Sequence, residues 1–214
     1  IRDKFLNIDS KDIDFTFVCE KSQTVEQGWL EMKSWMLDRG FEIFLETPDC
    51  FTIRAKFPKD HKFTGLVADF VMARKEVGYV EGTRRPILEL GTLEDDLVRR
   101  DFTLNALAED IDGNIIDLFN GIEDLKTGIL RTPLDPLVTM MDDPLRILRA
   151  LRFTITKDFT MSQDLWEAIQ QPNILKKLEQ TVLTFVREKL ADRLVVQEES
   201  KKNISLLKGK IKSL

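Results

Sequence analysis

Three arginines spaced for one face of a helix stand in the segment Asp143-Pro-Leu-Arg-Ile-Leu-Arg-Ala-Leu-Arg-Phe153. Arg146, Arg149 and Arg152 recur at every third residue, so a helix would carry all three on one stripe. Apolar residues fill most positions between them, which predicts a helix that is packed on one side and basic on the other. Guanidinium groups aimed the same way bind phosphate oxygens two at a time. The alternative is a solvated basic face paired with local carboxylates.

Two carboxylates near the start of the chain are spaced for one face of a strand. Asp12 and Asp14 lead into Phe15, Phe17 and Val18, which are strong strand formers. In a strand, residues i and i+2 project to the same side. Such a pair suits Mg²⁺, with substrate phosphates completing the octahedron of the metal. Surface strands and turns produce the same spacing, so the pair alone does not establish a metal site.

A third carboxylate, Asp69, is the only charge in the apolar run 66–73. An isolated carboxylate in a buried strand is costly unless it is paired or binds a metal. Together with the earlier pair it could form a three-carboxylate site for two metals, which suits in-line nucleotidyl transfer. The alternative is a strand-end aspartate paired with Arg54 or Arg74.

Hydrophobic periodicity predicts the elements that position these carboxylates. Four strands are expected in the first third of the chain, one carrying the aspartate pair and another carrying Asp69. An amphipathic helix with Trp and Met at helical spacing follows the first strand and ends at Gly40. The strands are expected near 12–19, 41–46, 50–57 and 65–74, and the helix near 22–39.

The remainder of the chain changes from a loop to a helical pattern. Residues 78–91 hold three glycines and a proline, which predicts a loop. Thr92 is expected to cap the next helix, and Asp112-Gly113 to form the turn of a hairpin. Beyond about residue 121, helices are expected at 144–156, 162–170, 173–181 and 183–197.

Composition is typical of an ordinary soluble globular protein. The 214 residues are 43% hydrophobic and 32% charged. There is no run of 18 apolar residues and no signal-peptide pattern, so we expect a cytoplasmic protein without a membrane anchor. Two cysteines without C-x-x-C spacing and a single histidine argue against a disulfide framework or a zinc site. A net charge of −5 argues against a general nucleic-acid coat protein, although basic residues can still be segregated on one face.

Six segments stand in order along the chain: Ile1–Asp3, Asp12–Asp14, Ala68–Phe70, Arg99–Ala106, Asp117–Leu125 and Asp143–Phe153. Together they resemble the tRNA nucleotidyltransferases of the bacterial and eukaryotic class (class II), the CCA-adding enzymes, and the related bacterial poly(A) polymerases. The resemblance implies an α+β fold: a polymerase-β-like nucleotidyltransferase head over 1–120, with a mixed β-sheet flanked by helices. An all-α neck and partial body that faces RNA would follow over 121–214.

The resemblance assigns the catalytic carboxylates. Asp12 and Asp14 match the two metal-binding aspartates of the family, with Mg²⁺ as the cofactor, and Asp69 matches the third acidic position. The family also has a Gly-Gly-x-Val-Arg-Asp turn that holds the incoming triphosphate. Ile1-Arg-Asp3 matches the end of that turn, and we expect the two glycines to lie outside this sequence.

The resemblance also implies which residues bind the nucleotide. Asp143 and Arg146 match the pair that reads the base. A carboxylate accepts from an amino group and a guanidinium donates to a ring acceptor, an edge that suits cytosine and adenine. The remaining positions contact triphosphate or sugar, and they are Arg2, Arg100, Asn105, Arg149 and Arg152.

The function implied is template-independent addition of nucleotides, CCA from CTP and ATP, to the 3′ end of tRNA. Poly(A) polymerases and enzymes that add only C or only A share the same head motifs, so they remain alternatives. A non-catalytic RNA-binding remnant is the alternative of another class. The sequence leaves the oligomeric state open.

Overall fold

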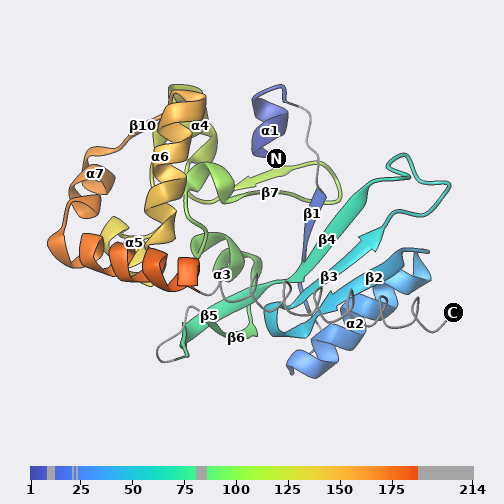
Figure 1. Cartoon of the computed structure of the whole chain (residues 1–214). Helices are drawn as coiled ribbons and strands as arrows, with labels where there is room; N and C mark the ends of the chain where they lie inside the picture. The colour runs from blue at the N-terminus through green and yellow to red at the C-terminus, as the bar shows by residue number, and fades with distance from the viewer. Residues whose placement is uncertain (9–12, 21, 23, 81–85, 188–214) are drawn as a thin grey trace, which may run out of the picture.

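A four-stranded sheet forms the first part of the molecule (Figure 1). The structure is a computed structural model, and it describes residues 1–8, 13–20, 22, 24–80 and 86–187. The strand order is β1-β4-β3-β2, with β1 parallel to β4 and the other pairs antiparallel. The strands are β1 (Ile13–Phe17), β2 (Glu42–Thr47), β3 (Thr52–Lys56) and β4 (Val67–Met72), preceded by the short helix α1 (Arg2–Phe5), and a 3-10 turn η1 (Pro48–Cys50) joins β2 to β3.

One face of this sheet is covered by helix α2 (Val25–Asp38). Its first turn is capped by Thr24, whose Oγ1 accepts a hydrogen bond from the backbone of Gln27 at 3.3 Å. Met32 and Met36 are fully buried in a core that also contains Phe70 of β4. Because side chains alternate along a strand, residues next to those buried ones project from the opposite face, which α2 leaves uncovered.

The loop predicted over 78–91 is wrong at both ends, since Gly78 and Tyr79 end strand β5 (Arg74–Tyr79) and a second strand begins at Pro86. Residues 86–90 form that second strand, β6 (Pro86–Leu90), which pairs antiparallel with β5. Proline is tolerated as the first residue of a strand, and Leu88 and Leu90 pack against the α2 core. The part of the predicted loop at 81–85 lies outside the described residues.

A mostly helical region follows the sheet, as the α+β prediction requires. The predicted cap is confirmed: Thr92 and Asp95 form a capping box at the start of α3 (Leu93–Val98). The predicted hairpin is confirmed as β7 (Leu107–Glu109) and β8 (Ile115–Asp117), with Gly113 at φ +86° in its turn. The other elements are η2 (Thr103–Asn105), α4 (Gly121–Thr127), β9 (Ile129–Leu130), α5 (Pro136–Asp142), α6 (Leu145–Lys157), β10 (Thr160–Met161) and α7 (Gln163–Ile169).

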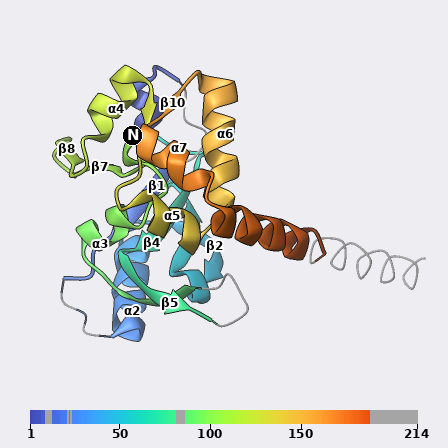
Figure 2. The ribbon, with the colours of Figure 1, turned by 90° about the vertical axis from the view of Figure 1, so that its left-hand side faces the viewer.

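The predicted helices at 144–156 and 162–170 correspond to α6 and α7. The helix expected at 173–181 and the start of the one expected at 183–197 are one continuous helix over the described residues 172–187, so the break expected near 182 is wrong. The remainder of the second predicted helix, 188–197, lies outside the described residues. In Figure 2 this helix projects from the side of the molecule, below α6 and α7. Among the residues that the structure describes, every helix is too short or too polar to cross a membrane.

A second core holds the helical region together. Its fully buried side chains come from Phe102, which precedes η2, from η2 itself, from β9 and from the helices. Phe102 stacks edge-on against Phe153 of α6, with ring centroids 5.7 Å apart. The segment that carries the predicted nucleotide-binding residues Arg100 and Asn105 is therefore anchored by packing on the arginine-bearing helix. The largest buried side chains of this core are Phe102, Leu104, Leu130, Met140, Ile147 and Leu165.

The contact between α4 and η2 is too close for any side chain larger than glycine at position 121. A Cβ on Gly121 would lie 2.2 Å from the carbonyl oxygen of Thr103. Thr103 cannot easily move away, because its hydroxyl donates to Asp124 at 2.7 Å and Arg131 donates to the same carboxylate at 2.8 Å. Asp124 and Thr103 are both buried.

Gly121→Ala is therefore expected to lower the free energy of unfolding by about 1–3 kcal/mol or more, since the backbone must shift to remove the overlap. Thermal unfolding followed by circular dichroism measures the effect. Gly78→Ala serves as the control, because the nearest atom to its added Cβ is 3.9 Å away. Equal melting temperatures for the two variants would show that the close approach is not a structural requirement.

Candidate active site

Two predicted catalytic carboxylates lie side by side on the uncovered face of the sheet. Asp14 of β1 is the register partner of Asp69 of β4, and Asp69 is in turn the partner of Arg54 on β3. Neighbouring strands lie about 4.8 Å apart, so the three residues form one row across the sheet. Asp14 is exposed, which leaves this row open to a substrate.

Asp69 is paired rather than isolated. The Arg54 guanidinium binds it with both arms, Nε to Oδ1 at 2.6 Å and Nη2 to Oδ2 at 2.7 Å. Of the two partners that the sequence allowed, the structure thus selects Arg54, whereas Arg74 donates to the carbonyl of Cys50.

The oxygen donors of Asp14 and Asp69 suit a hard divalent cation. Asp12, the other predicted metal ligand, lies outside the described residues. Within the described part of the chain, no group of three potential metal ligands is found. The three-carboxylate site therefore stays a prediction.

Asp96 is the buried anchor of the two arginines that follow α3. It is 1% exposed and accepts from Arg99 at 2.6 Å through Oδ1 and from Arg100 at 2.9 Å through Oδ2. The hydroxyl of Thr16 on β1 reaches the same carboxylate at 3.4 Å. Burial works to raise the pKa of Asp96, but the charges and hydrogen bonds of the two arginines outweigh it and lower this pKa below its ordinary value.

A second buried aspartate, Asp101, brings three predicted nucleotide-binding residues together. Its Oδ2 accepts from Nε of Arg149 at 2.5 Å, and its Oδ1 accepts from the side-chain amide of Asn105 at 2.9 Å. The side-chain oxygen Oδ1 of Asn105 accepts from Nη1 of Arg2 at 2.8 Å. Residues from the start of the chain, from η2 and from α6 are thereby joined in one hydrogen-bonded chain.

The other basic residues lie around the same chain of contacts. Arg100 donates to the backbone carbonyl of Asn105 at 3.2 Å. The guanidinium groups of Arg2 and Arg152 lie over the ring of Phe153, with 5.4 and 5.7 Å between the guanidinium carbon and the ring centroid. One arginine of the predicted stripe, Arg149, is thus paired with a carboxylate, as the alternative interpretation required, and the binding of a nucleotide by the stripe stays a prediction.

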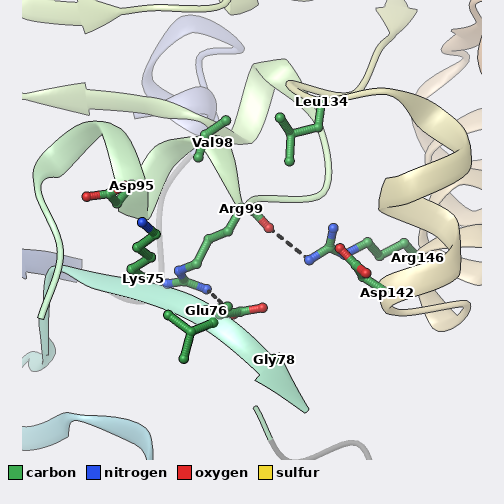
Figure 3. Close-up of a pocket in the computed structure, with 10 residues that line it drawn as sticks. Lys75, Glu76, Gly78, Asp95, Val98, Arg99, Leu134, Asp142 and Arg146 are labelled. Atoms are coloured by element: carbon green, nitrogen blue, oxygen red, sulfur yellow. Dashed lines mark hydrogen bonds and ion pairs between the residues drawn. The ribbon is translucent and has the colours of Figure 1, made fainter. Parts of the chain in front are cut away.

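Arg146 lies apart from this group, in a pocket of about 330 Å³ between β5, α3 and α6 (Figure 3). Its Nη2 donates to the backbone carbonyl of Arg99 at 2.8 Å, and Arg99 itself pairs with Glu76 of β5 at 3.3 Å. Asp142 lies beside Arg146 on the same side of this pocket. Burial raises the pKa of Asp142, while Arg146 and Lys177 oppose the rise.

Asp143 lies at the junction of α5 and α6. Its Oδ1 accepts from the backbone of Leu145 at 3.1 Å, a contact that stabilises the first turn of α6. This contact agrees with a capping role for Asp143.

Sequence reasoning did not single out four charged residues that organise the site. Asp96 could have been found, because it stands three and four residues before Arg99 and Arg100 on a helix. Asp101 lies within the segment that carries the family resemblance, but its partner Arg149 is distant in sequence. Glu76 and Asp142 had no signal in the sequence, since their contacts depend on how β5, α3 and α6 pack.

Comparison with known proteins points to one family. The Poly A polymerase head domain matches residues 1–131. A nucleotidyltransferase of Purpureocillium lilacinum, lcsQ, is 40% identical over 118 residues, which cover 55% of this chain and 20% of the relative. The CCA-adding enzyme of Lactobacillus helveticus is 45% identical over 108 residues, 49% of this chain and 27% of the relative. The mitochondrial CCA tRNA nucleotidyltransferase of Saccharomyces cerevisiae is 43% identical over 115 residues, 53% of this chain and 21% of the relative.

Solved structures give the same result. The CCA-adding enzyme of Bacillus stearothermophilus in complex with CTP superposes with a TM-score of 0.60 at 28% identity, covering 80% of this chain and 37% of that one. The Thermotoga maritima CCA-adding enzyme complexed with tRNA gives 0.56 at 26% identity, covering 78% and 34%. The match to each of the three sequence relatives in the preceding paragraph spans about a fifth to a quarter of the length of that relative.

Asp96→Asn is expected to lower the free energy of unfolding by about 2–4 kcal/mol at pH 7, because Arg99 and Arg100 would lose their shared buried anion. The pKa of Asp96 is lowered by folding, so its stabilisation is fully present above the ordinary carboxyl pKa of 3.8. It is lost as the pH falls from there through the lower pKa of the folded state. Urea unfolding of wild type and variant at several pH values measures both effects.

Glu94→Gln is the matched control, since Glu94 is an exposed acid on the same helix. It should change stability by less than about 0.5 kcal/mol. A difference between wild type and Asp96→Asn that stayed constant down to acid pH would contradict the role given to the ionised Asp96.

Proposed function

This chain belongs to the Poly A polymerase head domain family, and we propose that it transfers nucleotides to the 3′ end of an RNA without a template. The RNA we propose is tRNA, and the added sequence CCA, made from CTP and ATP. Relatives named CCA-adding enzymes, from bacteria and yeast, support this choice. So do the titles of structural relatives solved with CTP and with tRNA.

One observation carries the proposal from the structure itself. Arg2, Asn105 and Arg149 come from three separate segments. Buried Asp101 accepts hydrogen bonds from Asn105 and Arg149, and Asn105 in turn accepts one from Arg2. A buried carboxylate that orients guanidinium groups prepares them for an anionic ligand without leaving them free to collapse on one another. The triphosphate of a nucleotide is an anionic ligand of this kind.

In the proposed reaction, the RNA 3′-hydroxyl attacks the α-phosphorus of the nucleotide, and pyrophosphate leaves. Asp14 and Asp69, with Asp12, would hold a divalent metal, for which we propose Mg²⁺. When bound, such an ion would supply charge stabilisation to the reaction. Arg2, Arg100, Arg149 and Arg152, with Asn105, would hold the triphosphate and sugar.

The choice of base is proposed to depend on Asp143 and Arg146. The pocket beside Arg146 provides room next to a fixed guanidinium, since two backbone carbonyls hold that group at 2.8 and 3.5 Å.

We further propose a catalytic head over 1–120 and a helical neck and partial body over 121–214. We also propose that the protein is cytoplasmic. The name of the yeast relative places that enzyme in mitochondria.

The decisive experiment supplies the full chain with Mg²⁺, a tRNA that lacks its terminal CCA, and each labelled nucleoside triphosphate in turn. Incorporation of C and then A supports the proposal. Repeated incorporation of A alone would instead indicate a poly(A) polymerase, and no incorporation of any nucleotide would indicate a non-catalytic RNA-binding role.

Asp12→Ala and Asp14→Ala are each expected to reduce incorporation more than about a hundredfold, because a catalytic metal supplies several kcal/mol of charge stabilisation. Single-turnover incorporation measures the loss, and circular dichroism checks that the fold is kept. Asp60→Asn, an exposed carboxylate in the loop before β4, is the control and should retain full activity. Activity within tenfold of wild type in both alanine variants would remove these aspartates from the catalytic site.

Asp143→Asn separates base reading from helix capping. An Asn can still accept the hydrogen bond from the backbone of Leu145, but it presents a donor where the proposed base contact needs an acceptor. If Asp143 reads the base, discrimination against U and G should fall roughly ten- to a hundredfold, since each mismatched polar group costs about 1–3 kcal/mol. Relative kcat/KM values for the four triphosphates measure the change. Unaltered selectivity would leave capping as the role of Asp143.

A further inference from the structure

Arg54 ends the row of charged residues on the uncovered face of the sheet. Its guanidinium engages both oxygens of Asp69, at 2.6 and 2.7 Å, and Asp69 is the register partner of Asp14. The Arg54 side chain is 46% exposed and the Asp69 side chain 21% exposed. This pair therefore stands at the edge of the open surface, beside the carboxylate proposed to bind metal.

The pairing has two physical consequences for a metal site at this place. A carboxylate held by a two-armed guanidinium has a fixed orientation, and part of its capacity to accept is already used. The positive charge of Arg54, on the strand next to that of Asp69, also repels a divalent cation. Solvent weakens that repulsion, because the pair is partly exposed.

We propose that Arg54 is a positioning residue that acts through Asp69: it orients this carboxylate and restrains its affinity for a divalent cation. A cation at this sheet would then be held chiefly by Asp14 of β1, with Asp69 as a weaker, exchangeable ligand. This inference rests on the metal site of the proposed function.

Lys56 is a natural matched control for this proposal. It lies two residues from Arg54 on β3 and on the same face of the sheet, and it is likewise exposed. Its ammonium pairs with Glu42 at 2.9 Å, on the side of β3 away from Asp69. Removing either side chain deletes one positive charge from this face, but only one of the changes releases Asp69.

The test measures binding of Mn²⁺ alone to the full chain by electron paramagnetic resonance, with no nucleotide present. Arg54→Gln is expected to tighten Mn²⁺ binding on the order of three- to tenfold. Arg54→Lys should give a smaller increase, because a lysine keeps the charge but engages one oxygen. Lys56→Gln should stay within about twofold of wild type.

The route through Asp69 is tested in a double variant. In an Asp69→Asn background, adding Arg54→Gln should change Mn²⁺ affinity by less than about twofold, because the residue through which Arg54 acts is already altered. A full effect in that background would overturn the proposal in favour of a general effect of charge. Melting curves confirm folding, and if Arg54→Gln does not fold, Arg54→Lys decides by the same measurement.

Mn²⁺ affinity unchanged or weakened by Arg54→Gln, or no Mn²⁺ binding to wild type and variant alike, would overturn the proposal and leave Arg54 as a structural ion pair. These outcomes are separate from those of nucleotide incorporation. An active enzyme with unchanged Mn²⁺ affinity contradicts only the role of Arg54, whereas tightened binding without any incorporation contradicts only the proposed reaction.

Discussion

The ion cluster around Asp96 is the interaction on which the site depends. A carboxylate that is 1% exposed would be costly to ionise alone, yet two arginines and a threonine hydroxyl converge on it. The threonine belongs to β1 and the arginines to the end of α3, so one buried charge fixes the distance between the carboxylate strand and the basic residues. The backbone carbonyl of one of these arginines, Arg99, then receives Arg146 from α6. Asp96 thus links β1 to the end of α3, and the backbone of Arg99 links α3 to α6.

Asp101, which follows α3 in the sequence, is a second buried carboxylate that binds an arginine. It is 7% exposed and pairs with Arg149, whose side chain remains half exposed. In both cases a buried carboxylate holds a guanidinium that still reaches the surface. This arrangement limits the conformational freedom of long basic side chains before any ligand arrives, so less entropy is lost when an anion binds. The packing of Phe102 against Phe153 keeps the two partners at the required spacing.

Much of the local structure could be predicted from the sequence, because it depends on neighbouring residues. The helix that carries Arg146 follows from hydrophobic periodicity, and the start of α3 follows from Thr92 and Asp95. Strand β6 could not be predicted, because a segment rich in glycine and proline becomes a strand only through pairing with β5. The partner of Asp69 was likewise undecided, since sequence allowed two arginines and the register of β3 against β4 chose between them. The links through Asp101 depend on tertiary packing and had no local signal.

The parallel pairing of β1 with β4 has a consequence for how the protein folds. Parallel neighbours need a long connection, and here α2, β2 and β3 all lie between the two strands in sequence. Asp14 therefore gains its neighbour Asp69 only after every intervening element has been synthesised, and closing so long a loop costs entropy before the contact forms. The local hairpin of β2 and β3 can form early, whereas the row of carboxylates is completed late. During synthesis on the ribosome, the nascent chain would thus expose β1 as an unpaired strand until β4 emerges.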